Sequence, residues 1–149
     1  MPEVTDMILT VDDHVVPGGP EVELLEVGPG SRAAVLALVS SEHGHFLQYY
    51  ESPSVGTVVC GIYEKDQLVG AVLLEYEPEA RESTADAALA ALVVAGRHRG
   101  RGIASAAIGA ASRMLSAAGY RRVIAEWVWS RQAYERLGFR VWRTRSISR

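Results

Sequence analysis

A turn rich in glycine and arginine is the part of this sequence best suited to bind an anionic ligand. Gly100 and Gly102 permit positive φ angles and a close approach of the backbone to a ligand. Arg97, Arg99 and Arg101 place charged donors around the same turn. An apolar run precedes the turn and an amphipathic pattern follows it, and a strand, a glycine turn and a helix N-terminus in this order are suited to hold phosphate oxygens. A diphosphate therefore fits this segment chemically.

Two common diphosphate-binding motifs do not match the turn. A P-loop needs a lysine directly after its last glycine, and the only lysine of the chain is Lys65. A Rossmann turn follows the first strand of its domain and has a third glycine where this chain has Ser105. The turn lies late in this chain, after segments typical of antiparallel hairpins.

The periodicity of apolar residues predicts strands alternating with helices. Positions 103, 107, 108, 111 and 115 share one helical face, and Gly119 is placed to end that helix. The β-rich runs on either side of residues 65–67 indicate a hairpin. We expect strands over 7–11, 21–27, 57–64, 68–76, 87–94, 122–128 and 139–144, and helices over 33–39, within 40–54, over 103–118 and over 130–137.

With these surroundings, the turn resembles the pyrophosphate-binding motif of the GNAT N-acetyltransferase superfamily, Gln/Arg-x-x-Gly-x-Gly/Ala. The segment Arg97–Ala104 (RHRGRGIA) carries the motif, and Tyr134–Phe139 (YERLGF) supplies a Tyr near a Gly-Phe pair at the family's distance. The order of expected elements over residues 57–144 is also similar. The resemblance implies an α/β fold with a mixed, mostly antiparallel twisted sheet flanked by helices, here with a shortened C-terminal end.

The resemblance also implies that acetyl-CoA is the acyl donor. In the family, the acetyl and pantetheine part runs beside the strand before the motif, and the N–H of Val94, or of its neighbour, becomes the candidate donor to the thioester carbonyl. The pyrophosphate would lie on the amides of residues 99–105, with the motif arginines near the phosphates. The implied cofactor-binding residues are Leu92, Val93, Val94, Arg97, Arg99, Gly100, Arg101, Gly102, Ile103, Ala104 and Ser105.

For catalysis, the resemblance implies direct transfer of the acetyl group to a primary amine in a ternary complex. Tyr134 matches the family's general acid, which protonates the departing CoA thiolate. The acceptor ammonium must lose a proton before it attacks, and Glu75 and Glu126 are the first candidates for this base. Glu77 and Asp86 are further candidates.

Two features depart from the family pattern. Trp127 stands where many members have an Asn that contacts the cofactor, and together with Trp129 and Trp142 it could form an aromatic wall or fill the core. The family usually closes with two strands after the Gly-Phe pair, whereas only eleven residues follow Gly138 in this chain of 149. We therefore expect Met7–Val16 to cover the vacant edge, in its own chain or in a partner's.

Two other residue types of catalytic or metal sites, histidine and cysteine, lack the context for such a role. His98 is expected to be a surface residue among the motif arginines. His43 and His45 have no third ligand nearby, so no metal site is expected. Cys60 lies in an apolar strand and is expected to be a small core residue, and as the only cysteine it cannot form an internal disulfide.

Composition supports one globular domain in a reducing compartment, which we take to be the cytoplasm. The net charge is −3, 48% of the residues are hydrophobic, and no apolar run is long enough to span a membrane. We expect an N-terminal extension over 1–19 and one domain over 20–149. Twelve of the arginines lie at or after residue 97, which suggests an anionic partner for the C-terminal part.

Three functions remain open at this point. The first is an N-acetyltransferase whose acceptor is a small molecule or a protein amine, and which could form a homodimer. The second is a catalytically inactive acetyl-CoA-binding sensor on the same fold. The third, nucleic-acid binding through the Arg-Gly turn, is disfavoured because that pattern occurs once, inside an expected strand–helix junction.

Overall fold

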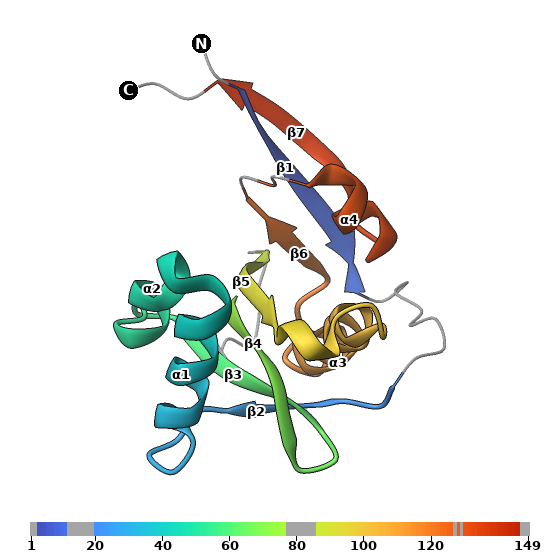
Figure 1. Ribbon diagram of the computed structural model, residues 1–149. Coiled ribbons are helices and arrows are strands. Elements are labelled where there is room, and N and C mark those ends of the chain that lie inside the picture. Colours follow the sequence, from blue (N-terminus) through green and yellow to red (C-terminus); the bar gives the residue numbers. More distant parts are fainter. Residues whose placement is uncertain (1–2, 12–19, 77–85, 127, 129, 147–149) are drawn as a thin grey trace.

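Within the residues that the structure describes, seven strands form one twisted sheet in the order β2-β3-β4-β5-β6-β1-β7 (Figure 1). This computed structural model describes residues 3–11, 20–76, 86–126, 128 and 130–146. Only β5 and β6 pair in parallel, and all other neighbours are antiparallel. The strands are β1 (Glu3–Thr10), β2 (Glu23–Glu26), β3 (Thr57–Glu64), β4 (Gln67–Glu75), β5 (Ala87–Val94), β6 (Arg122–Ala125) and β7 (Arg140–Ser146).

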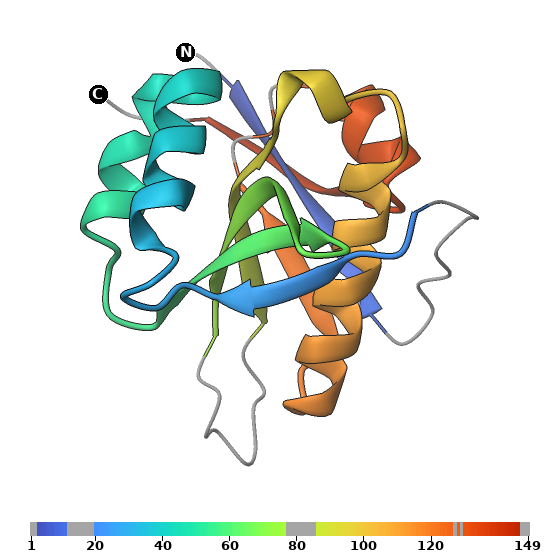
Figure 2. The ribbon, with the colours of Figure 1, turned by 60° about the horizontal axis from the view of Figure 1, so that its bottom comes forward.

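Helices cover both faces of the sheet. Figure 2 shows α1 and α2 on one side of the strands and α3 on the other. None of the described helices is both long and apolar enough to cross a membrane. The helices are α1 (Arg32–His43), η2 (Gly44–Phe46), α2 (Leu47–Glu51), η3 (Gly96–His98), α3 (Ile103–Ala117) and α4 (Arg131–Arg136).

The mixed α/β fold expected from the sequence is confirmed, with a mostly antiparallel sheet flanked by helices. The β3–β4 hairpin and the strand before the glycine turn lie where the patterns predicted them. Gly119 ends α3 at φ +94°, and the N–H of Tyr120 bonds the carbonyl of Leu115 at 2.9 Å, which is the closing bond of a Schellman motif. β6 is shorter than expected, because it ends at Ala125.

Strand β4, which lies inside the sheet, is buried on both faces. Ala71 and Leu73 join the cluster that contains Val35 and Val39 of α1. The residues at positions 72 and 74, which point to the opposite face, pack in the larger cluster on the α3 side. Burial on both faces explains why β4 is a continuous apolar run rather than an alternating one.

The first strand of the chain lies inside the sheet. β1 pairs antiparallel with β6 on one side and with β7 on the other. From the sequence alone, residues 1–19 are an N-terminal extension, and Met7–Val16 are expected to cover the vacant edge of the sheet. The structure instead makes Glu3–Thr10 an internal strand of the same chain, and residues 12–16 of the expected segment lie outside the described part.

A buried carboxylate holds β1 to β7. Asp6 is fully buried, and its carboxylate accepts hydrogen bonds from Nε of Arg143 at 2.6 Å and from Nε of Arg145 at 2.7 Å. Both guanidinium groups remain partly exposed, so they keep contact with water while they neutralise the buried charge. This pairing accounts for two of the C-terminal arginines without an external anion.

We expect Asp6→Asn to lower the free energy of unfolding by about 2 kcal/mol, in the range for hydrogen bonds to charged groups. The amide keeps the shape of the side chain but loses the charge that the two arginines neutralise. Urea unfolding measures the change. Glu3→Gln, on the same strand with an exposed side chain, is the matched control. Equal destabilisation by both variants would contradict the role of the Asp6 carboxylate in holding β1 to β7.

Candidate active site

The site begins where β5 and β6 diverge. Their parallel ladder covers only Ala87–Leu89 of β5 and Val123–Ala125 of β6. Beyond it, Ala91 adopts φ +50°, and the register against β4 shifts, which marks a β-bulge. The rest of β5 therefore has no described strand on the β6 side of its backbone.

The backbone of Val94 faces this unpaired side. The N–H of Ala95 donates to the carbonyl of Val69 at 2.8 Å, so the neighbouring pair of Val94 and Gly70 is a non-hydrogen-bonded pair. In such a pair, the N–H and C=O groups point away from the partner strand. The N–H of Val94 is thus directed away from β4, and its carbonyl accepts a hydrogen bond from Nε of Arg99 at 3.2 Å.

The glycine turn leads from β5 into the N-terminus of α3. Gly100 has φ +78° and Gly102 has φ +83°, a region that favours glycine. The first intrahelical bond runs from the N–H of Ala106 to the carbonyl of Gly102, and no side chain caps the helix. The amides of residues 102–105 are therefore free of intrahelical acceptors. Ser105 Oγ is also buried without a hydrogen-bond partner among the described residues.

These features fit the diphosphate of acetyl-CoA. A Cβ built on Gly100 meets no heavy atom within 4 Å, so the turn faces open space. Free amides and the positive end of the helix dipole favour an anion at this place. Arg97 lies in the same turn with an exposed side chain, and none of the described carboxylates forms an ion pair with it.

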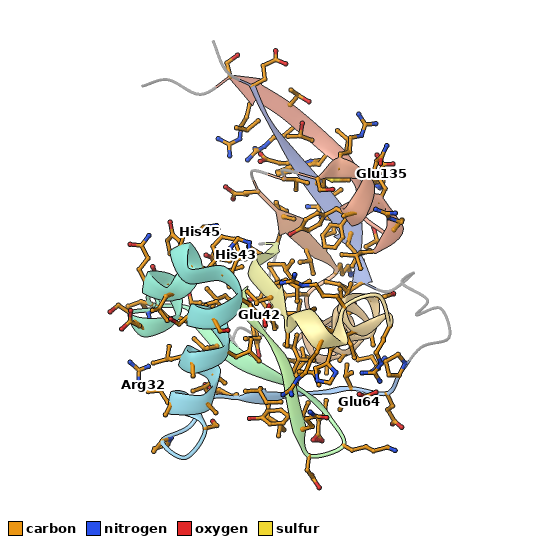
Figure 3. The ribbon with its side chains drawn as sticks, in the orientation of Figure 1. Arg32, Glu42, His43, His45, Glu64 and Glu135 are labelled. Carbon is orange, nitrogen blue, oxygen red and sulfur yellow. The ribbon has the colours of Figure 1, made fainter. Side chains whose placement is uncertain are left out.

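Two of the three motif arginines form ion pairs that the sequence did not predict. Arg99 bonds Glu42 of α1 at 3.1 Å. Arg101 bonds both carboxylate oxygens of Glu64, the last residue of β3, at 2.8 and 2.9 Å. The partners come from separate elements that only the tertiary fold brings to the turn (Figure 3).

His98 is buried, with 8% of its surface exposed, so the expectation of a surface residue is wrong. Its Nδ1 lies 3.0 Å from Nη1 of Arg101. Because a guanidinium can only donate, Nδ1 is the acceptor in this contact. His98 is the last residue of η3, so the contact joins η3 to the glycine turn.

One cavity of about 480 Å³ brings together all three predicted catalytic side chains, which are Tyr134, Glu75 and Glu126. Its floor is the part of β5 from Ala88 to Ala91, directly beside the divergence from β6. One wall comes from α4 and the segment before it, and the other comes from η2, α2 and the ends of β3 and β4. The cavity therefore joins the open side of β5.

Tyr134 lies on α4 and packs edge-on against Phe139, with ring centroids 5.4 Å apart. Burial raises the pKa of its phenol above the ordinary value of 10.0. The hydroxyl is therefore protonated at neutral pH and can donate.

The two glutamates differ in their surroundings. Glu126 directly follows β6, and its carboxylate lies 3.4 Å from Nη2 of Arg145. Glu75 ends β4, opposite Ala88 of β5. No ion pair of Glu75 is found in the part of the chain that the structure describes.

Other candidates are placed elsewhere. Asp86 forms an ion pair with Arg122 at 2.8 Å, outside the cavity lining. Trp142 is exposed and stacks under Arg143 at 4.2 Å. Glu77, Trp127 and Trp129 lie outside the described residues.

Cysteine and histidine chemistry finds little support in the structure. Cys60 is fully buried, as expected of a small core residue, and burial raises the pKa of its thiol to about 11. The thiol is therefore protonated at neutral pH. His43 and His45 contact each other through their Nδ1 atoms at 3.1 Å. Among the described residues there is no group of three or more His, Cys, Asp or Glu side chains that could hold a metal ion.

The side chains of the wall opposite Tyr134 were not predicted as site residues from the sequence. Their polar and aromatic composition was visible between residues 40 and 54, but nothing in the local pattern placed them over β5. Tyr50 from the same region is buried, and its hydroxyl donates to the carbonyl of Ala91 at the bulge. The missed lining residues include Phe46, Tyr49, Ser52, Ser54, Thr57 and Ser130.

We expect the phenol of Tyr134 to titrate above pH 10, because burial disfavours the phenolate. The absorbance of phenolate in wild type minus that of Tyr134→Phe, followed from neutral to alkaline pH, isolates this group. A difference curve with its midpoint at or below the ordinary value of 10.0 would contradict the buried placement.

The comparisons with known proteins agree with this architecture. The sequence matches the family described as "Acetyltransferase (GNAT) family" over residues 32–139. Among curated proteins, no match was found.

Solved structures with the same fold share little sequence with this chain. One is a GCN5-related glucosamine N-acetyltransferase region in a fungal multi-domain GH3 β-N-acetylglucosaminidase, with a TM-score of 0.73, 20% identity, and 96% of this chain and 20% of that chain covered. A GCN5-related N-acetyltransferase from Sphaerobacter thermophilus has a TM-score of 0.66 and 19% identity, with 95% of this chain and 49% of that chain covered. AAC(6')-Iy in complex with the bisubstrate analogue CoA-S-monomethyl-acetylneamine has a TM-score of 0.61 and 15% identity, with 80% of this chain and 91% of that chain covered.

The chain spans between 20% and 60% of the length of the first five similar structures, which include the fungal region and the Sphaerobacter thermophilus protein. At such identities the likeness shows the fold, while the family rests on the sequence match across most of the chain. The chain belongs to the GNAT acetyltransferase family, whose members use acetyl-CoA as the acyl donor.

Proposed function

We propose that this chain is an acetyl-CoA-dependent N-acetyltransferase that transfers the acetyl group directly to a primary amine in a ternary complex. The observation that carries the proposal is the single cavity that Tyr134, Glu75 and Glu126 line together over β5. A proton donor and two carboxylates thus share one space beside the unpaired edge of that strand. Transfer from a thioester to an amine requires one base for the acceptor ammonium and one proton donor for the leaving thiolate, and this space supplies both.

The donor substrate would occupy the open side of β5 and the glycine turn. The backbone of Leu92, Val93 and Val94 supplies the strand edge, and the N–H of Val94 would donate to the thioester carbonyl. The amides from Gly102 to Ser105 would hold the pyrophosphate. Arg97, Arg99 and Arg101 would bind phosphate oxygens by charge-assisted hydrogen bonds.

The reaction then needs three proton transfers. A carboxylate, Glu126 or Glu75, takes a proton from the acceptor ammonium, and the free amine forms a bond to the thioester carbon. The bond from carbon to sulfur breaks, and the phenol of Tyr134 gives its proton to the departing thiolate. The excess proton on the new amide nitrogen then passes to the phenolate of Tyr134, which restores the phenol. The raised pKa of that phenol supports the role, because it keeps the proton in place until the thiolate forms.

We expect Tyr134→Phe to lower kcat about a hundredfold, the lower end of the effect of a positioned acid. The Kd for acetyl-CoA should stay near that of wild type, because the phenol acts on the leaving sulfur only during transfer. Release of free thiol with an amine panel measures kcat, and calorimetry measures Kd.

Tyr63→Phe removes a hydroxyl from β3, outside the cavity lining, and is the control. An unchanged kcat in Tyr134→Phe would remove the tyrosine from its role. Binding of acetyl-CoA by wild type without turnover of any amine would favour the alternative function, a catalytically inactive acetyl-CoA sensor.

We expect Glu42→Gln and Glu64→Gln each to tighten acetyl-CoA binding, by up to about fivefold, the range for partly exposed ion pairs. Each carboxylate now competes with phosphate for a motif arginine. Calorimetric titration with CoA at low ionic strength measures the change. Glu51→Gln, at the end of α2, is the matched control, and weaker binding in both test variants would show that the pairs support the site instead.

A further inference from the structure

The charge of the cavity is one-sided. Glu75 and Glu126 line it, and no Arg, Lys or His is found among the described lining residues. A second acidic group is more than a single ammonium requires. The excess negative charge favours an acceptor with more than one positive charge.

The two carboxylates stand on opposite walls. Glu75 ends β4 and Glu126 follows β6, and these strands flank β5 on its two sides. Neighbouring strands lie about 4.8 Å apart, so the two backbones are separated by roughly 10 Å. Along the strands the offset is two residues, or roughly 7 Å, because Glu75 pairs with Ala88 and the residue before Glu126 pairs with Leu89. The two side chains therefore enter the cavity from opposite sides of β5, and an extended dication can pair with one of them at each end.

The two carboxylates have different surroundings, and these indicate different roles. Glu126 shares its wall with Tyr134, so it is on the side of the reacting sulfur and amine. Arg145 at 3.4 Å already compensates part of its charge. Glu75 has no ion pair among the described residues, and its charge is left for the ligand.

Aromatic side chains complete the wall of Glu75. Phe46 and Tyr49 line the same cavity from η2 and α2, and Tyr49 has 52% of its surface exposed. Aromatic faces attract ammonium groups and pack against methylene chains. An aliphatic chain that ends in an ammonium group matches this wall in both respects.

Building on the proposed function, we propose that the acceptor is an aliphatic diamine or longer polyamine. Glu75 binds its distal ammonium, while Glu126 deprotonates the amine that is acetylated. The distal ammonium keeps its proton throughout. The reacting ammonium gives one proton to the carboxylate of Glu126, its nitrogen bonds the acetyl carbon, and the CoA thiolate leaves with the proton of Tyr134. The acylated nitrogen then gives its excess proton to the phenolate of Tyr134.

The experiment compares α,ω-diamines with amino alcohols of the same chain length, in which a hydroxyl replaces the distal ammonium. The kcat/KM of each is measured by thiol release with acetyl-CoA. In wild type we expect the best diamine to exceed its matched amino alcohol by about tenfold or more, which corresponds to about 1.4 kcal/mol.

Variants then separate the two carboxylates. Glu75→Gln should bring the ratio of diamine to amino alcohol close to one. Glu126→Gln should lower kcat for both acceptors and leave the ratio of diamine to amino alcohol unchanged. Since each ratio is measured within one variant, a loss of folded protein cancels. Glu23→Gln removes the same charge from β2, away from the cavity, and should leave both rates and the ratio at wild-type values.

The outcomes distinguish this inference from the proposed function. Equal rates of acetylation for diamine and amino alcohol in wild type would overturn the inference and leave the N-acetyltransferase standing. If the preference for the diamine is lost in Glu126→Gln but kept in Glu75→Gln, the roles assigned to these two residues are wrong. Binding of acetyl-CoA without acetylation of any amine would overturn both proposals.

Discussion

The divergence of β5 from β6 is the constraint on which the rest of the site depends. A parallel ladder that continued to Val94 would satisfy the backbone of β5 on both sides and leave no strand edge for a substrate. The ladder stops at Leu89 because β6 ends at Ala125 and because Ala91 bulges out of register. The hydroxyl of Tyr50 holds the carbonyl of that bulged residue, so a side chain from α2 stabilises the opening in the sheet.

β1 holds the far side of the same opening. β6 has only four residues, and it gains its second partner from β1, which in turn pairs with β7. The buried carboxylate of Asp6 joins these strands through Arg143 and Arg145, and Arg145 also reaches Glu126 at the cavity. One cluster of charges therefore connects the first strand of the chain to the wall that carries Tyr134.

The electrostatics of the turn and of the cavity are complementary to different substrates. The turn combines free amides and arginines, and two of those arginines are held by Glu42 and Glu64. The cavity lies further back along β5, over Ala88–Ala91, and is lined by the carboxylates of Glu75 and Glu126. The positively charged turn would attract the anionic acyl donor, and the negatively charged cavity would attract the cationic acceptor. Each substrate is therefore disfavoured in the region that binds the other.

The sequence by itself determined the elements and the chemistry of the glycine turn, because apolar periodicity, Gly100, Gly102 and Gly119 act on local backbone geometry. It also singled out Tyr134, Glu75 and Glu126. Only the tertiary structure decided that they share one cavity, that His98 is buried, and that Glu42 and Glu64 pair with the motif arginines. It also decided that residues 3–10 lie between β6 and β7. These features depend on contacts between residues far apart in the chain, and local patterns carry no information about such contacts.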